Sequence, residues 1–107
     1  MTVDIVQDVS GWLIKSSDAG GAAGLTRGSG AGVSIPSAKD MSEFLTAIDM
    51  SSSGRKYYFT RSDGASIKAY PSGRKVGSIV IERAQGNWIR LSPSDAGDLR
   101  LKLTRLP

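Results

Sequence analysis

The sequence predicts a single α+β domain built from two successive units, each a set of antiparallel strands followed by a helix. The main observation is a strand-to-helix corner that occurs twice. Residues 33–37 (VSIPS) lead into a helical pattern, and residues 89–93 (IRLSP) lead into another. The length of 107 residues leaves room for one core. We therefore expect two pseudo-repeats, at about residues 1–54 and 55–107.

The first unit opens with strands and a glycine-rich stretch. Residues 3–16 carry apolar side chains in the pattern of one or two strands. Residues 18–32 contain mostly Gly and Ala among few large apolar side chains, so we expect a long loop or hairpin with a weak strand at residues 25–27. A strand at residues 33–35 then precedes the first corner.

The first helix has the clearest pattern in the chain. Met41, Phe44, Leu45 and Ile48 recur at i, i+3, i+4 and i+7 and form one apolar stripe. Ser37 is placed to cap the helix. The pattern predicts a helix over residues 38–50, which ends at the serines and glycine of residues 51–54.

Four short strands follow in the second unit, each separated from the next by turn residues. Sequences rich in Asp, Gly, Pro, Ser and Asn interrupt the apolar runs and are typical of tight turns. The predicted strands are residues 56–61, 66–70, 76–83 and 88–91. This arrangement is a meander of antiparallel strands.

The last segment, residues 94–106, fits two patterns. Leu99, Leu101 and Leu103 alternate as in a strand, yet the same segment also keeps helical spacing. Ser92 as a cap and Pro93 at the first helical position favour a helix. In that helix Leu101 is left exposed or at an interface.

The composition excludes several kinds of site. The sequence has no Cys and no His, so it lacks thiolate nucleophiles, imidazole bases and the usual zinc, haem and copper ligands. Its longest apolar runs have three residues, far fewer than the ~20 that cross a bilayer. We expect a soluble cytoplasmic protein that is not an enzyme and uses no cofactor and no metal.

Charge is distributed unequally between the two units. Residues 1–54 hold three basic and six acidic residues, a net charge of −3. Residues 55–107 hold eleven basic residues and four acidic ones, a net charge of +7. A polyanionic partner is therefore expected to contact the second unit.

The two corners resemble those of known single-stranded nucleic-acid-binding domains. Residues 89–99 (IRLSPSDAGDL) resemble the end of the positive-cofactor-four type of domain, and residues 33–36 (VSIP), continuing to Ile48, resemble a corner of the purine-rich-element-binding (PUR) repeat. These groups and the Whirly proteins pair units of four strands and a helix to bind single-stranded nucleic acid. The resemblance implies single-stranded DNA or RNA as partner. The glycine-rich, acidic first unit departs from the pattern.

The meander itself predicts a binding face. Alternation along the strands places Tyr57 and Phe59 inward and leaves Tyr58 outward, and it exposes an aromatic side chain beside a cation on three strands. Aromatic rings stack on bases and cations pair with phosphates. The third strand is ambiguous, because either of its faces can point inward. The candidate nucleic-acid-binding residues are Lys56, Tyr58, Arg61, Lys68, Tyr70, Arg74, Lys75, Arg83, Trp88 and Arg90.

Two other interpretations stay open. Outward Tyr, Lys and Arg also keep a sheet soluble and guard its edges. Residues 65–71, 76–79 and 87–91 resemble strands of a bacterial Src-homology-three-like domain, although the spacing before Trp88 is too short, so a protein-interaction module is the alternative function. A homodimer is open as well, since the glycine-rich first unit has few side chains with which to complete the fold alone.

Overall fold

The computed structural model describes residues 3–8, 11–16, 19–20, 32–73, 76–83 and 86–105. These form eight strands, one short 3-10 helix and two α-helices. In chain order they are β1 (Val3–Asp8), β2 (Gly11–Ser16), β3 (Ala19–Gly20), β4 (Gly32–Ile35), η1 (Ala38–Asp40), α1 (Met41–Ser52), β5 (Tyr57–Thr60), β6 (Ser66–Pro71), β7 (Ile79–Arg83), β8 (Trp88–Leu91) and α2 (Pro93–Thr104). The predicted α+β class is confirmed.

The strands form two antiparallel sheets. One has three strands in the order β1-β2-β4, and the other has five in the order β3-β8-β7-β6-β5. The four strands of the meander are consecutive neighbours in the larger sheet, as the turn residues predict. The two-residue β3 joins the far edge of that sheet, beside β8.

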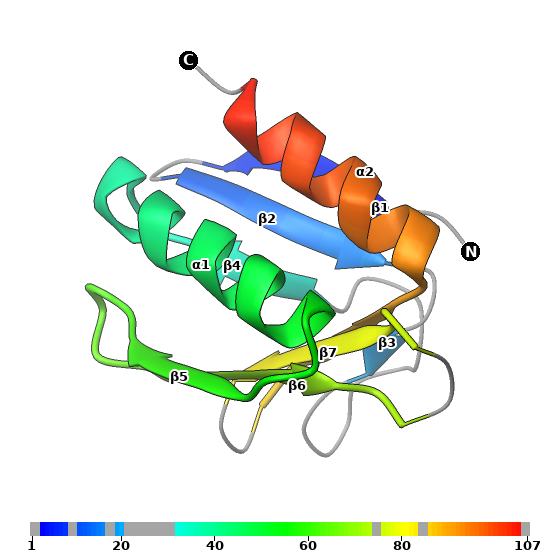
Figure 1. Ribbon diagram of the computed structural model, residues 1–107. Coiled ribbons are helices and arrows are strands. Elements are labelled where there is room, and N and C mark those ends of the chain that lie inside the picture. Colours follow the sequence, from blue (N-terminus) through cyan, green and yellow to red (C-terminus); the bar gives the residue numbers. More distant parts are fainter. Residues whose placement is uncertain are drawn as a thin grey trace.

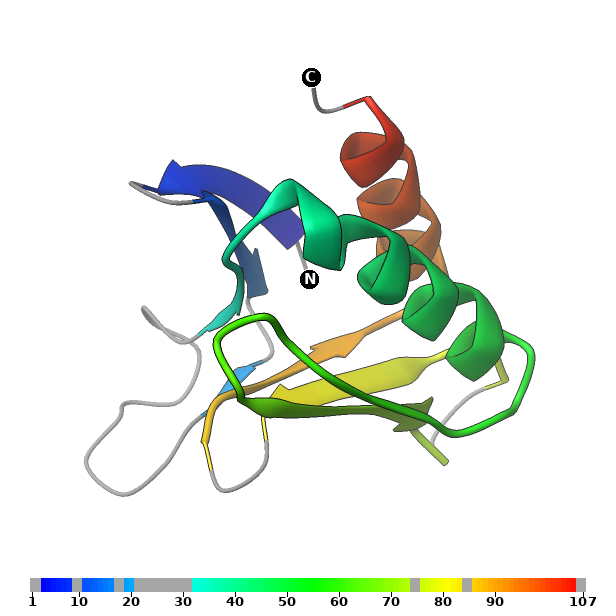
Figure 2. The same cartoon turned by 90° about the vertical axis from the view of Figure 1, so that its left-hand side faces the viewer.

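Both helices lie on one side of the five-stranded sheet and pack against each other (Figures 1 and 2). Helix α1, from the first half of the chain, packs on β5, β6 and β7 of the second half. Helix α2, from the second half, packs on β1 of the first half and on β8. Each half therefore contributes a helix to the sheet of the other.

The core lies between the helices and the two sheets. The apolar stripe of α1 supplies Phe44 and Ile48, both at most 1% exposed, while Met41 and Leu45 pack at its margin. The Phe44 ring meets Phe59 of β5 edge to face, with ring centroids 5.0 Å apart. Aromatic pairs favour this geometry, so the contact fixes β5 under α1.

The two helices begin differently. The side chain of Ser92 accepts a hydrogen bond from the Asp95 backbone N–H at 3.1 Å and caps α2, which confirms the helix predicted there. At the first corner the predicted start of the helix was wrong, because residues 38–40 form a 3-10 turn and α1 begins at Met41. Ser37 caps neither element and instead donates to the Asp40 carboxylate at 3.1 Å.

Two strand predictions also need correction. The third strand of the meander begins at Ile79 rather than at residue 76, because Val76 lies in the preceding turn with 97% of its surface exposed. Part of the glycine-rich stretch is strand, since Gly20 belongs to β3 and Gly32 begins β4. The weak strand predicted at residues 25–27 lies outside the described residues.

Candidate nucleic-acid interface

The candidate interface is the face of the five-stranded sheet that the two helices do not cover. Ile67, Ala69, Ile89 and Leu91 point to the helices and are fully buried. The residues between them point to the opposite side, as strand alternation requires. The predicted facing of β6 and β8 is thus confirmed, as is that of β5, where Tyr58 is 59% exposed and Phe59 packs inward.

The strand register arranges the outward side chains in rows that cross the sheet. One row runs from Tyr58 on β5 through Lys68 and Glu82 to Trp88 on β8. The next row joins Tyr70, Val80 and Arg90. The pairing also resolves the ambiguous third strand. Ile79 and Ile81 belong to the core cluster, whereas Glu82 and Val80 lie on the other side of the sheet, where Val80, between Tyr70 and Arg90, is only 6% exposed.

Trp88 is held in place from two sides. The guanidinium carbon of Arg90, two residues along the same strand, lies 5.2 Å from the centre of the indole, a cation–π distance. On the other side the ring lies against Gly20 of β3, where an added Cβ atom would come within 2.7 Å of three indole atoms. Only glycine leaves that space. Sequence reasoning missed Gly20, because nothing in its neighbourhood indicates pairing with β8.

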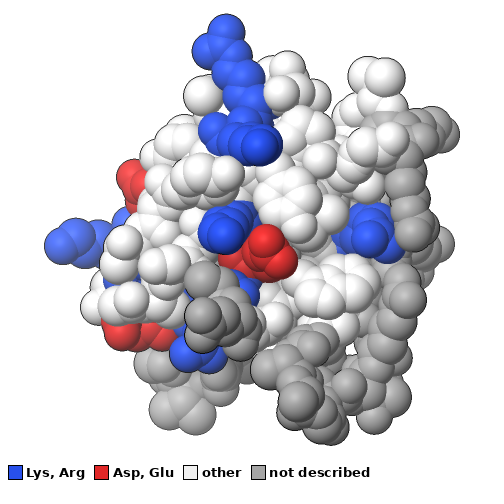
Figure 3. All heavy atoms as spheres, turned by 90° about the horizontal axis from the view of Figure 1, so that it is seen from below, with Lys and Arg blue, Asp and Glu red and all other residues white. Residues whose placement is uncertain are grey.

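Tyr70 and Glu82 form the polar centre of the face. Partial burial, the negative charge of Glu82 and a hydrogen bond to that carboxylate raise the pKa of Tyr70 above its ordinary value of 10.0, against an opposing effect of Arg90. The phenol is therefore protonated at neutral pH. Figure 3 looks onto this side of the molecule, where separate groups of Lys and Arg atoms surround an acidic centre among uncharged atoms.

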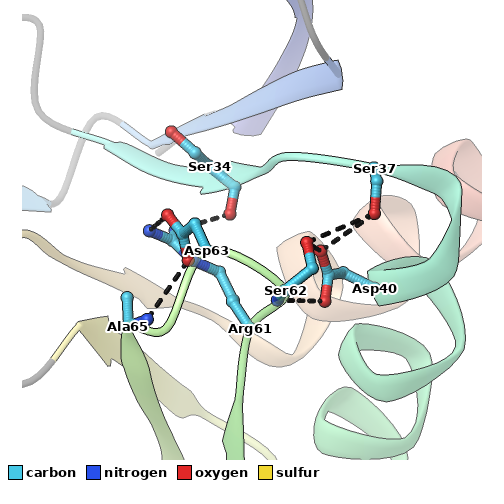
Figure 4. Close-up of polar contacts among 7 residues, drawn as sticks. All are labelled: Ser34, Ser37, Asp40, Arg61, Ser62, Asp63 and Ala65. Atoms are coloured by element: carbon cyan, nitrogen blue, oxygen red, sulfur yellow. Dashed lines mark hydrogen bonds and ion pairs between the residues drawn. The ribbon is translucent and has the colours of Figure 1, made fainter.

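Arg61 does not belong to this face, which corrects its assignment as a nucleic-acid contact. Its side chain is 5% exposed and its guanidinium donates to both carboxylate oxygens of Asp63, at 3.1 and 2.8 Å, and to the carbonyl of Ser34 at 2.7 Å (Figure 4). Beside it, buried Asp40 accepts from the Ser62 backbone N–H at 2.9 Å and hydroxyl at 2.6 Å. Arg61 therefore joins the β5–β6 turn to β4.

The other predicted contacts divide into three groups. Lys56 is exposed and immediately precedes β5, where alternation puts it on the side of Tyr58. Arg83 is exposed at the end of β7 but follows the inward alternation of Ile81 and lines a cavity with Arg61, on the helix side of the sheet. Arg74 and Lys75 lie outside the described residues.

Comparisons with protein-family models, with curated proteins and with solved structures found no match. Within the described ranges, no helix is long and apolar enough to span a membrane. The same residues contain no group of three or more acidic side chains that would hold a metal ion. The open face of the five-stranded sheet is the site on which a functional proposal rests.

Proposed function

We propose that the protein is a non-enzymatic binding protein for single-stranded DNA or RNA, with little sequence preference, and that the open face of the five-stranded sheet is its binding surface. One observation carries the proposal. Three aromatic side chains, Tyr58, Tyr70 and Trp88, share this face with the cations Lys68 and Arg90. The resemblance of both strand-to-helix corners to single-stranded nucleic-acid-binding domains points the same way.

The spacing of the rings suits bases that are spread apart. Tyr58 and Trp88 stand in one row but three strands apart, roughly 14 Å at the usual strand separation. Tyr70 lies between them in the next row. Bases of a single strand are free to stack on such rings, at about 1–3 kcal/mol each, whereas the bases of a duplex stack on one another.

The cations of the face set the expected response to salt. Lys56, Lys68 and Arg90 provide three positive charges against the carboxylate of Glu82. If three phosphates are neutralised, the logarithm of the association constant falls with a slope of about −2 against the logarithm of salt concentration. The affinity should then drop about 20-fold between 50 and 200 mM salt.

Fluorescence anisotropy of a labelled oligothymidylate tests this directly. We expect saturable binding at low salt, the slope given above, and an affinity at least fivefold weaker in Tyr58→Ala and Lys68→Gln. Lys39→Gln is the matched control, because Lys39 is exposed on η1, away from the face. Circular dichroism verifies that each variant stays folded.

Three results would contradict the proposal. They are the absence of binding at low salt, an affinity that does not change with salt, and equal losses in Lys68→Gln and Lys39→Gln. The last would mean that general positive charge, rather than this face, attracts the strand.

A further inference from the structure

A separate polar cavity lies on the helix side of the five-stranded sheet. It has a volume of about 270 Å³ and is lined by residues of β2, β4, the β5–β6 turn and the end of β7. Its walls include Trp12, Ser34, Arg61, Asp63 and Arg83. The volume is just below the range of pockets for drug-sized ligands, so the cavity has room for one small ligand.

The described residues that line the cavity carry a net positive charge. Among them, Arg61 and Arg83 contribute two guanidinium groups against the carboxylate of Asp63. That carboxylate is already engaged, since it accepts two hydrogen bonds from Arg61 and one from the Ala65 backbone N–H at 3.2 Å. In the part of the chain that the structure describes, no acidic side chain forms a salt bridge with Arg83.

Arg61 still has hydrogen-bonding capacity. A guanidinium has five N–H donors, and the bonds to Asp63 and Ser34 use one each on Nε, Nη1 and Nη2. One N–H remains on each terminal nitrogen. Among the described residues, the cavity thus has one guanidinium with spare donors and one with no acidic partner, a pair that matches the several oxygens of a phosphate.

Trp12 contributes an aromatic residue to the cavity wall. It is half-buried on β2, packs against the core and lines the same cavity as the two arginines. An indole beside guanidinium groups is a combination that recognises a planar ring bearing an oxyanion.

From this arrangement we infer that the cavity binds a nucleoside monophosphate unit, with its phosphate on Arg83 and Arg61 and its base against Trp12. The unit is either a free mononucleotide or the phosphorylated end of a longer strand. This inference goes beyond the proposed function and does not depend on it, because the cavity and the open face lie on opposite sides of the sheet.

The two tryptophans allow the sites to be read separately. The Trp88→Phe variant leaves Trp12 as the only tryptophan, and Trp12→Phe leaves Trp88. In Trp88→Phe we expect adenosine monophosphate to change the Trp12 fluorescence in a saturable way, with a dissociation constant of about 1 mM or lower. Adding Arg83→Gln should weaken binding at least tenfold. Adding Lys68→Gln, on the open face, should leave it unchanged.

Adenosine tests the contribution of the phosphate, and an oligothymidylate with or without a 5′-phosphate tests whether the ligand is a strand end. Adenosine without phosphate should bind at least tenfold more weakly than adenosine monophosphate. A 5′-phosphorylated oligothymidylate that binds more tightly than its unphosphorylated form identifies the source as a strand end. A response to the mononucleotide alone identifies a free nucleotide. Either response supports the inference.

The inference is overturned if adenosine monophosphate causes no saturable change up to about 10 mM, if Arg83→Gln binds as well as its parent, or if adenosine binds equally well. Failure of the proposed function is distinguished by the Trp12→Phe variant. In that variant the oligonucleotide would leave the Trp88 fluorescence unchanged, independently of how Trp12 responds to adenosine monophosphate in Trp88→Phe.

Discussion

Two arginine–carboxylate pairs in this protein have similar geometry but different surroundings. Arg61 binds Asp63 through two hydrogen bonds and is 5% exposed. Arg100 of α2 binds Asp49 of α1 through two hydrogen bonds, with side chains 45% and 51% exposed. A buried charge that loses its partner is costly, whereas an exposed pair contributes little. The two pairs should therefore respond differently to the same substitution.

We expect Asp63→Asn to lower the free energy of unfolding by about 1–2 kcal/mol, because it leaves the buried Arg61 without a counter-charge. This is less than the 3–5 kcal/mol of a fully buried pair, since Asp63 is itself 45% exposed. Asp49→Asn is the matched control and should leave the urea midpoint unchanged. Equal effects of the two substitutions would contradict the structural role of Arg61.

The effect of Asp63→Asn should also depend on pH. Hydrogen bonds from Arg61, and to a smaller extent from the Ala65 backbone, hold the pKa of the Asp63 carboxyl below its ordinary value of 3.8. The unfolded chain then takes up this proton at higher pH than the folded chain. The stabilisation is full above the unfolded pKa and is lost as the pH falls through the folded pKa.

Urea unfolding between about pH 5 and pH 2 measures this loss. The wild-type midpoint should approach that of Asp63→Asn as the pH falls. A difference between the two proteins that stays constant over this range would show that the Asp63 carboxylate contributes no charge-dependent stability.

At the scale of elements, the two strand-to-helix corners use their serines differently. Ser92 accepts the Asp95 N–H and caps α2, whereas Ser37 donates to Asp40 and leaves α1 to begin after a 3-10 turn. Similar sequence thus produces two structures. At the first corner Asp40 is 4% exposed and has hydrogen-bond partners in the β5–β6 turn, so tertiary contacts decide its conformation.

The cap of α2 predicts a specific loss of stability. Ser92→Ala should lower the free energy of unfolding by ~1 kcal/mol, because the Asp95 N–H at the helix start loses its acceptor. Ser94→Ala changes an exposed residue of the same helical turn and should have little effect. Thermal unfolding followed by circular dichroism compares them. A loss in Ser94→Ala as large as in Ser92→Ala would refute the capping role.

Local patterns in the sequence predict most elements, because each such element buries one face. Alternation correctly placed Tyr58 outward and Phe59 inward, and helical spacing correctly placed Phe44 and Ile48 in the core. Local patterns do not indicate which residues far apart in the sequence come into contact. Gly20 lies against Trp88, 68 positions along the chain, and Arg61 reaches the carbonyl of Ser34. The open face was therefore predictable, but the cavity lined by Arg61 and Arg83 was not.

At the scale of the whole molecule, the two halves depend on each other. Helix α1 packs on the sheet strands β5, β6 and β7, and α2 packs on β1 (Figure 2). A half expressed alone would expose the apolar residues that the other half covers. Because each half contributes a helix to the sheet of the other, a single chain supplies both helices and both sheets.

We therefore expect fragments 1–54 and 55–107 to be unfolded when separate and to regain secondary structure when mixed. Circular dichroism and amide proton NMR dispersion measure this. A dispersed, native-like spectrum from residues 55–107 alone would show that the meander and α2 fold without α1.

The proposed binding surface for a single strand is the open face of the five-stranded sheet. NMR of ¹⁵N-labelled protein, titrated at low salt with an oligothymidylate of about ten bases, locates the bound strand residue by residue. We predict the largest shifts at Tyr58, Lys68, Tyr70 and Arg90 and at the indole N–H of Trp88. The absence of shifts, or shifts concentrated on α1, α2 and β1, would contradict the claim.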